Sequence, residues 1–188
     1  DLATSPRRTD QLELHLLARS LFAITGDSGP THAAMLLDRP VLTVNIACPV
    51  MGFPIRADSL ACLKDVRHRD TGRPLTLAER FGEDFNRYPL DHARYDVRDN
   101  SPELLLAAVR EMVALQEAPC PETSGQRAYA RRVRALAVAA QGRVPMFLKW
   151  GPDQGFLGAG RMSQAWLDQQ EESLFDGAPD DFSQPDER

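Results

Sequence analysis

The sequence predicts an α/β protein with a Rossmann-like parallel sheet flanked by helices and a helical C-terminal extension. Residues 21–24 and 40–44 are short apolar runs of the kind that form buried strands. Between them, residues 33–37 are rich in alanine, leucine and methionine, which favour a helix. A turn containing Gly26 and Gly29 joins the first strand to this helix. Strand, glycine turn, helix and strand in this order are typical of one unit of an open parallel sheet.

An amphipathic helix over residues 10–20 precedes this unit, and the spacing of its leucines predicts that Leu12, Leu16 and Leu17 face inward. The elements expected after the unit are a strand at 60–66, a short helix from 76, a strand at 94–98, and helices at 101–115, 125–140 and 163–167. Local signals fix the start of two of these helices. Thr76 and Glu79 are spaced as a capping box, and Ser101 followed by Pro102 is a typical helix start.

Composition restricts the function classes. A net charge of −5 and a pI near 5.4 argue against a general nucleic-acid binder. The three cysteines, Cys48, Cys62 and Cys120, are widely spaced and lack the patterns of a zinc site, so we expect a reducing compartment and no structural metal. The sequence has no apolar run of membrane-spanning length and no basic-then-apolar leader. We therefore expect a cytoplasmic protein with one domain over residues 1–175 and a disordered acidic tail over 176–188.

The turn before the second helix is the strongest candidate binding site. A helix N-terminus carries free N–H groups and about half a positive charge, so it favours a phosphate or diphosphate. The turn also offers more polar groups than one cap needs. Its candidate residues are Thr25, Gly26, Asp27, Ser28, Gly29, Pro30, Thr31 and His32, with Asn45 at the end of the next strand. The alternative is a structural turn in which Ser28 or Asp27 simply caps the helix.

Two other enzyme classes fit the turn less well. Residues 26–30 resemble the nucleophile segment of chymotrypsin-like proteases, but one glycine is missing and a helix former follows instead of a strand. A dinucleotide-dependent oxidoreductase would need the Gly-x-Gly-x-x-Gly spacing and an acidic residue after the next strand. Here Val44 and Asn45 stand at that position.

Residues 26–34, Gly-Asp-Ser-Gly-Pro-Thr-His-Ala-Ala, resemble the donor-binding lobe of GT-B glycosyltransferases. The similarity is closest to heptosyltransferase-like enzymes, which carry Gly-Asp-Ser/Thr-Gly-Pro-x-His before an alanine-rich helix. This resemblance implies the C-terminal half of a GT-B fold. It also implies that the turn holds the diphosphate of a nucleotide-sugar, with Asp27, Ser28 and His32 contacting phosphate or sugar oxygens. No further cofactor is implied, and the sequence contains no Asp-x-Asp pair that would indicate a metal.

Four further blocks, at residues 14–18, 39–45, 99–104 and 161–167, resemble bacterial glycosyltransferases associated with surface polysaccharides. Gln164 and Met162 depart from the proline and isoleucine of that family's last block. The resemblance implies transfer to a glycan or lipid-linked acceptor. It also implies an N-terminal lobe outside this chain that carries the acceptor site and the catalytic base, and it allows peripheral attachment to the inner membrane. The alternative is a non-catalytic Rossmann-like scaffold or protein-interaction domain.

Overall fold

The structure is a computed structural model that describes residues 4–26, 28–49, 54–86, 93–118, 120–140, 158–170 and 172–176. Its centre is a four-stranded sheet in the order β1 (Ala23–Thr25), β2 (Val41–Ile46), β3 (Leu60–Leu63) and β6 (Arg161–Met162). All three strand pairings are parallel. The predicted α/β fold with a Rossmann-like parallel sheet is therefore confirmed.

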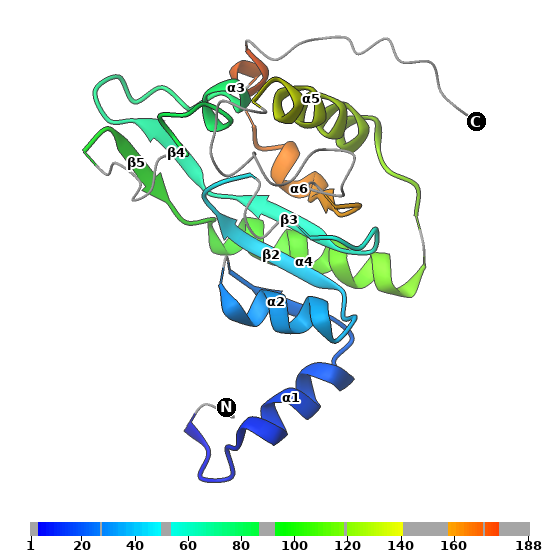
Figure 1. Ribbon diagram of the computed structural model, residues 1–188. Helices are drawn as coiled ribbons and strands as arrows, with labels where there is room; N and C mark the ends of the chain where they lie inside the picture. The colour runs from blue at the N-terminus through cyan, green and yellow to red at the C-terminus, as the bar shows by residue number, and fades with distance from the viewer. Residues whose placement is uncertain are drawn as a thin grey trace.

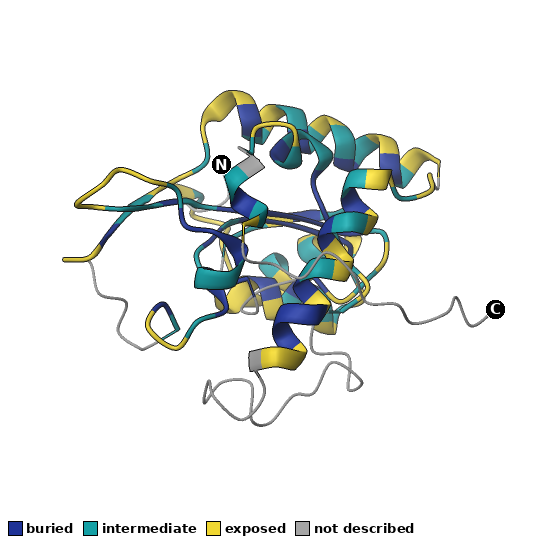
Figure 2. Ribbon diagram, turned by 90° about the horizontal axis from the view of Figure 1, so that it is seen from above, coloured by how far each residue is buried: buried dark blue, intermediate teal, exposed yellow. Residues whose placement is uncertain are grey.

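Helices cover both faces of this sheet. They are α1 (Asp10–Arg19), α2 (Gly29–Leu36), α3 (Leu77–Arg80), α4 (Pro102–Glu117), α5 (Ser124–Ala140) and α6 (Gln164–Leu167), followed by the 3₁₀ helix η4 (Glu172–Phe175). Figure 1 shows their arrangement, and Figure 2 shows α4 and α5 on opposite sides of the central strands. Every residue of β3 is buried, as are five of the six residues of β2. Continuous burial of this kind is expected for parallel strands that are covered on both faces.

The main core joins the sheet to α4, α5 and α6. Trp166 of α6 is buried at its centre, where its indole lies edge-on to Tyr129 of α5 with 6.0 Å between ring centroids. The indole Nε1 donates to the carbonyl of Leu63 at the end of β3, at 2.8 Å. The C-terminal extension is therefore an integral part of the core.

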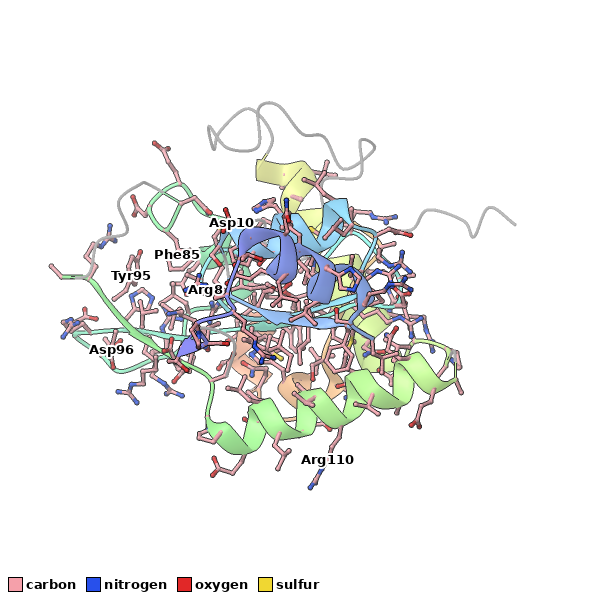
Figure 3. All side chains as sticks on the ribbon, turned by 90° about the horizontal axis from the view of Figure 1, so that it is seen from below. Arg8, Asp10, Phe85, Tyr95, Asp96 and Arg110 are labelled. Carbon is pink, nitrogen blue, oxygen red and sulfur yellow. The ribbon has the colours of Figure 1, made fainter. Side chains whose placement is uncertain are left out.

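The antiparallel strands β4 (Asp65–His68) and β5 (Tyr95–Arg98) form a second, two-stranded sheet, a wide hairpin whose long connection contains α3. It has its own small apolar cluster, in which Phe85 and Tyr95 lie edge to face at 5.4 Å. Both rings are labelled in Figure 3. The expected single strand at 60–66 was thus wrong in one respect, because the chain leaves the parallel sheet at Lys64 and enters this hairpin.

The predicted helix starts are confirmed. Ser101 Oγ accepts the Leu104 N–H at 3.2 Å, and Thr76 and Glu79 form the capping box. The inward orientation predicted for Leu16 was wrong: it is 48% exposed, and α1 contains no buried residue. The reason is that α1 lies at the end of the molecule beside edge strand β1 (Figure 1), where only Leu17 reaches a small apolar cluster. Most of the expected tail, residues 177–188, lies outside the described residues.

Candidate functional site

The predicted turn lies at the carboxyl edge of the parallel sheet. Gly26 directly follows β1, and Ser28 is the N-cap residue of α2. A Cβ on Gly26 would lie 3.9 Å from the carbonyl oxygen of Val44 in β2, so the turn passes close to the neighbouring strand. Ligands of open α/β sheets bind at this edge. Asp27, which the sequence also assigns to the site, lies outside the described residues.

The outer surface of the turn is open. Ser28, Gly29, Pro30 and His32 are all exposed. Ser28 occupies the N-cap position in an extended conformation, yet its side chain makes no capping hydrogen bond. Gly29 is the first helical residue, whose N–H points away from the helix and has no acceptor within it. Among the described residues, no hydrogen bond is formed by the Ser28 hydroxyl to the helix or by the Gly29 N–H, which leaves both groups open to an anion.

The number of backbone donors is smaller than the sequence suggests. We expected the backbone of residues 29–31 to supply N–H groups to a phosphate. However, Pro30 has no N–H, and the Thr31 N–H donates to the Ser28 carbonyl at 3.1 Å. Within the described part of the turn, the Gly29 N–H is therefore the one backbone donor of residues 29–31 without an acceptor, so side-chain donors gain importance.

Two threonines hold the turn from beneath. Thr31 is buried, its hydroxyl donates to the carbonyl of Gly26, and its Oγ1 lies 2.8 Å from the Oγ1 of Thr25. Thr43 lies directly opposite Thr25 on β2, and among the described residues its buried hydroxyl has no hydrogen-bond partner. Thr25 and Thr31 therefore position the turn, and the buried Thr31 hydroxyl is used within it.

Asn45 forms structural hydrogen bonds at the same edge of the sheet. It adopts a left-handed backbone conformation with φ of 57°, which asparagine tolerates better than most residues. Its N–H donates to Asn100 Oδ1 at 3.0 Å, and its own Oδ1 accepts the Asn100 N–H at 2.7 Å. Because the side-chain oxygen already accepts the Asn100 N–H, the amide Nδ2 is the group of Asn45 that would donate to a ligand.

A cavity of about 280 Å³, which no sequence pattern predicted, lies near the end of β3 and the start of α4. Arg80, at the end of α3, lines this cavity and is buried. Its Nη2 donates to the Lys64 carbonyl at 3.0 Å, whereas Nε and Nη1 have no partner among the described residues. Desolvation lowers the pKa of Arg80 to about 10, so the side chain remains a cation at neutral pH.

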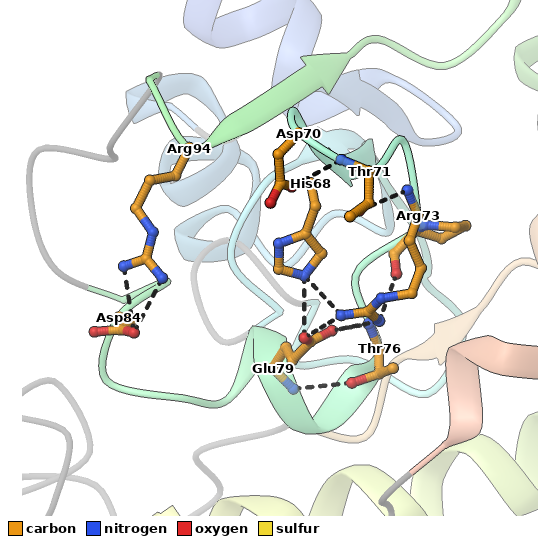
Figure 4. Close-up of polar contacts among 9 residues, drawn as sticks. His68, Asp70, Thr71, Arg73, Thr76, Glu79, Asp84 and Arg94 are labelled. Carbon is orange, nitrogen blue, oxygen red and sulfur yellow. Dashed lines mark hydrogen bonds and ion pairs between the residues drawn. The ribbon is translucent and has the colours of Figure 1, made fainter.

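Glu79 belongs to an ion-paired network on the hairpin side of α3, shown in Figure 4. Arg73 Nη2 lies 2.6 Å and His68 Nε2 3.0 Å from its Oε1, and the Thr76 N–H donates to its Oε2 at 2.9 Å. Burial raises the pKa of Glu79, but these hydrogen bonds outweigh it and bring the pKa to about 2. A carboxylate held ionised in this way is a poor proton donor or acceptor at neutral pH, so we assign it to stability.

Comparison of the chain with protein-family models, curated proteins and solved structures finds no match. Within the described ranges, no group of three or more histidine, cysteine or acidic side chains is placed to hold a metal ion. None of the helices described is both long and apolar enough to cross a bilayer.

Proposed function

We propose that this chain is the donor-binding lobe of a glycosyltransferase and that it holds the diphosphate of a nucleotide-sugar at residues 25–32. The observation that carries the proposal is Ser28, an exposed N-cap serine without a capping bond, beside the open Gly29 N–H at the carboxyl edge of a parallel sheet. Serine at an N-cap normally bonds the helix itself, so an uncommitted hydroxyl at this position favours a ligand role.

The chemistry of glycosyl transfer fits this surface. As the bond from the anomeric carbon to the diphosphate breaks, negative charge builds on the leaving nucleoside diphosphate and must be stabilised. The α2 dipole, the Gly29 N–H and the Ser28 hydroxyl would stabilise it without a metal ion. His32 is exposed on the first turn of α2, where its imidazole would donate to a phosphate or sugar oxygen. The glycan or lipid-linked acceptor and the catalytic base belong to a second lobe under this proposal.

Thermal unfolding in the presence of UDP, ADP, GDP, CMP and inorganic phosphate tests the proposal. A ligand that binds only the folded state at a hundred times its Kd stabilises it by about 2.7 kcal/mol, so one nucleotide should raise the Tm clearly. We expect Ser28→Ala and His32→Ala each to lower the apparent affinity for this nucleotide, measured from the dependence of Tm on its concentration, at least fivefold. Matched controls are Ser124→Ala at the exposed start of α5 and His15→Ala on exposed α1. Equal nucleotide affinity in Ser28→Ala, His32→Ala and wild type would reject the site.

One observation favours the second candidate, a protein-interaction domain. Leu14, Leu16, Leu21 and Ile24 are about half or more exposed, and all four lie on α1, on β1 or between them. Apolar side chains gathered at a sheet edge mark association surfaces. Sedimentation velocity distinguishes the two candidates: a monomer with saturable nucleotide binding supports the donor lobe, whereas self-association without nucleotide binding supports the interaction domain.

A further inference from the structure

Arg80 is the most unusual charged residue among those described. Its side chain lies beneath the surface between β3, the hairpin and α5, and one of its nitrogen atoms contacts the Lys64 carbonyl. The other two nitrogens, Nε and Nη1, find no acceptor in the described chain. A buried guanidinium is normally paired with a carboxylate or fully hydrogen-bonded, because transferring the cation from water is costly. Asp65 interacts with Arg80 electrostatically, but among the described residues no carboxylate is hydrogen-bonded to the guanidinium.

The acidic side chains around the cavity are already engaged. Asp65 accepts from Arg67 at 3.0 Å, and Asp99 pairs with Lys64 at 2.7 Å. Of the lining residues, Arg67, Arg80 and Arg98 are cationic and Asp65 and Asp99 are anionic, which leaves an excess of positive charge. Arg80 is thus the one described cation of this lining without a hydrogen-bonded carboxylate.

The walls of the cavity suit a small organic molecule. Leu75, Leu104 and Leu174 supply an apolar side, while Asn100, Gln169 and Gln170 supply amide groups. Binding pockets commonly combine apolar walls with a few polar groups that fix orientation, and their volumes begin at roughly 300 Å³. The volume of about 280 Å³ is sufficient for a small organic acid or a compact phosphate ester, and too small for a whole nucleotide-sugar.

We propose that this cavity is a second ligand site, which binds a small organic anion through a carboxylate or phosphate group paired with Arg80. The site is separate from the turn at residues 25–32 and does not depend on the function proposed for that turn. The two regions are joined by the reciprocal Asn45 and Asn100 hydrogen bonds at the carboxyl edge of the sheet.

The rival explanation is a trapped water. The hydroxyl of Tyr129 is also buried without a partner, and it interacts electrostatically with Arg80. A water between these groups would satisfy both without any ligand. Such a water predicts no stabilisation by anions, whereas an anion site predicts a saturable one.

Titration of the whole chain with inorganic phosphate and, separately, with malonate tests the proposal, using Tm and calorimetry at constant ionic strength with chloride as the reference. We expect at least one of these oxyanions to raise the Tm saturably and to bind at a single site. The comparison of phosphate with malonate distinguishes a phosphate ligand from a carboxylate ligand. Arg80→Met should abolish this response. Arg80→Lys keeps the charge with fewer donors and should weaken binding at least tenfold. Arg110→Met is the matched control, because Arg110 is exposed on α4 and points away from the body of the molecule in Figure 3.

The outcomes separate cleanly. A response that persists in Ser28→Ala and disappears in Arg80→Met assigns it to the cavity, whereas the reverse assigns it to the turn. If Arg80→Met does not fold, the loss or retention of affinity in Arg80→Lys decides. The proposal is overturned if neither oxyanion stabilises wild type beyond chloride, or if both Arg80 variants respond as wild type does.

Discussion

Helices α2 and α4 begin with similar sequences at the same edge of the sheet, but the hydrogen bonding of their N-cap serines differs. Each has a serine at the N-cap and a proline within the next two residues. Ser101 caps α4 by accepting the Leu104 N–H, and Asn100 beside it bonds both Asn45 and the Leu63 carbonyl. Ser28 makes no capping bond, and the turn around it is exposed.

The difference teaches that a helix-start pattern does not by itself tell a structural cap from a binding turn. At α4 the polar groups are used within the fold, and the helix start is fixed to β2 and β3. At α2 the buried Thr31 and Thr25 hold the turn from within, while Ser28 and the Gly29 N–H remain uncommitted. The state of the serine hydroxyl separates the two roles.

Asn100→Ala should have the largest effect on stability. It removes the acceptor of the Asn45 N–H and one donor to the Leu63 carbonyl, and both of these backbone groups belong to the sheet edge. The Asn45 N–H is then left without its acceptor, whereas the Leu63 carbonyl keeps the Trp166 Nε1 donor, so the free energy of unfolding should fall by about 1–3 kcal/mol. Urea denaturation followed by circular dichroism measures this change.

Asp99→Ala is the matched control for Asn100→Ala. Asp99 is adjacent and exposed, and its ion pair with Lys64 is a surface one, so its removal should change the free energy of unfolding by less than about 0.5 kcal/mol. Equal effects of the two substitutions would show that the Asn45 and Asn100 pair does not hold the edge.

Glu79→Gln should have an intermediate effect that depends on pH. The folded-state pKa of about 2 lies below the ordinary value of 4.5, so ionised Glu79 stabilises the fold above about pH 5. This contribution is lost as the pH falls from about 5 towards 2. Because the Glu79 side chain is 36% exposed, solvent screens its interactions, and we expect ionised Glu79 to contribute about 1 kcal/mol to the free energy of unfolding.

Unfolding of wild type and Glu79→Gln at pH 7 and pH 3 measures that contribution. The difference between the two proteins should be largest at pH 7 and clearly smaller at pH 3, and it should close only as the pH approaches 2. Asp84→Asn serves as the control, because Asp84 pairs with Arg94 at 3.3 Å on the surface and is 65% exposed (Figure 4). A gap between wild type and Glu79→Gln that is constant across pH would contradict the assignment.

The two helix caps test the comparison most directly, through effects of about 1 kcal/mol or less. Ser101→Ala should lower the free energy of unfolding by about 1 kcal/mol, because it removes a formed capping bond. Ser28→Ala should change it by no more than about 0.3 kcal/mol, since no such bond exists. Chemical denaturation resolves this difference. A loss in Ser28→Ala as large as that in Ser101→Ala would mean that Ser28 caps α2 and is not free for a ligand.

The parts of the fold that could be predicted are those specified by sequence patterns a few residues long. The unit β1, α2 and β2 was predicted because its strands, turn and helix each have a distinct composition over a few residues. The reciprocal pair of Asn45 and Asn100 was not predicted, because it joins residues 55 positions apart. The Arg80 cavity was missed for the same reason: its lining comes from segments between Asp65 and Leu174. The exposure of Leu16 was missed because helical periodicity shows which face is apolar and not whether anything covers it.

The hydrogen bonds of the Leu63 carbonyl have a consequence for co-translational folding. It accepts from Asn100 Nδ2 at 2.7 Å and from Trp166 Nε1 at 2.8 Å, and these donors follow it in the chain by 37 and 103 residues. During synthesis on the ribosome, the end of β3 can form these contacts only after α4 and then the segment from β6 to α6 have been synthesised. The four-stranded sheet therefore cannot be complete before β6 has been synthesised, and the Leu63 carbonyl gains its second donor only when Trp166 follows.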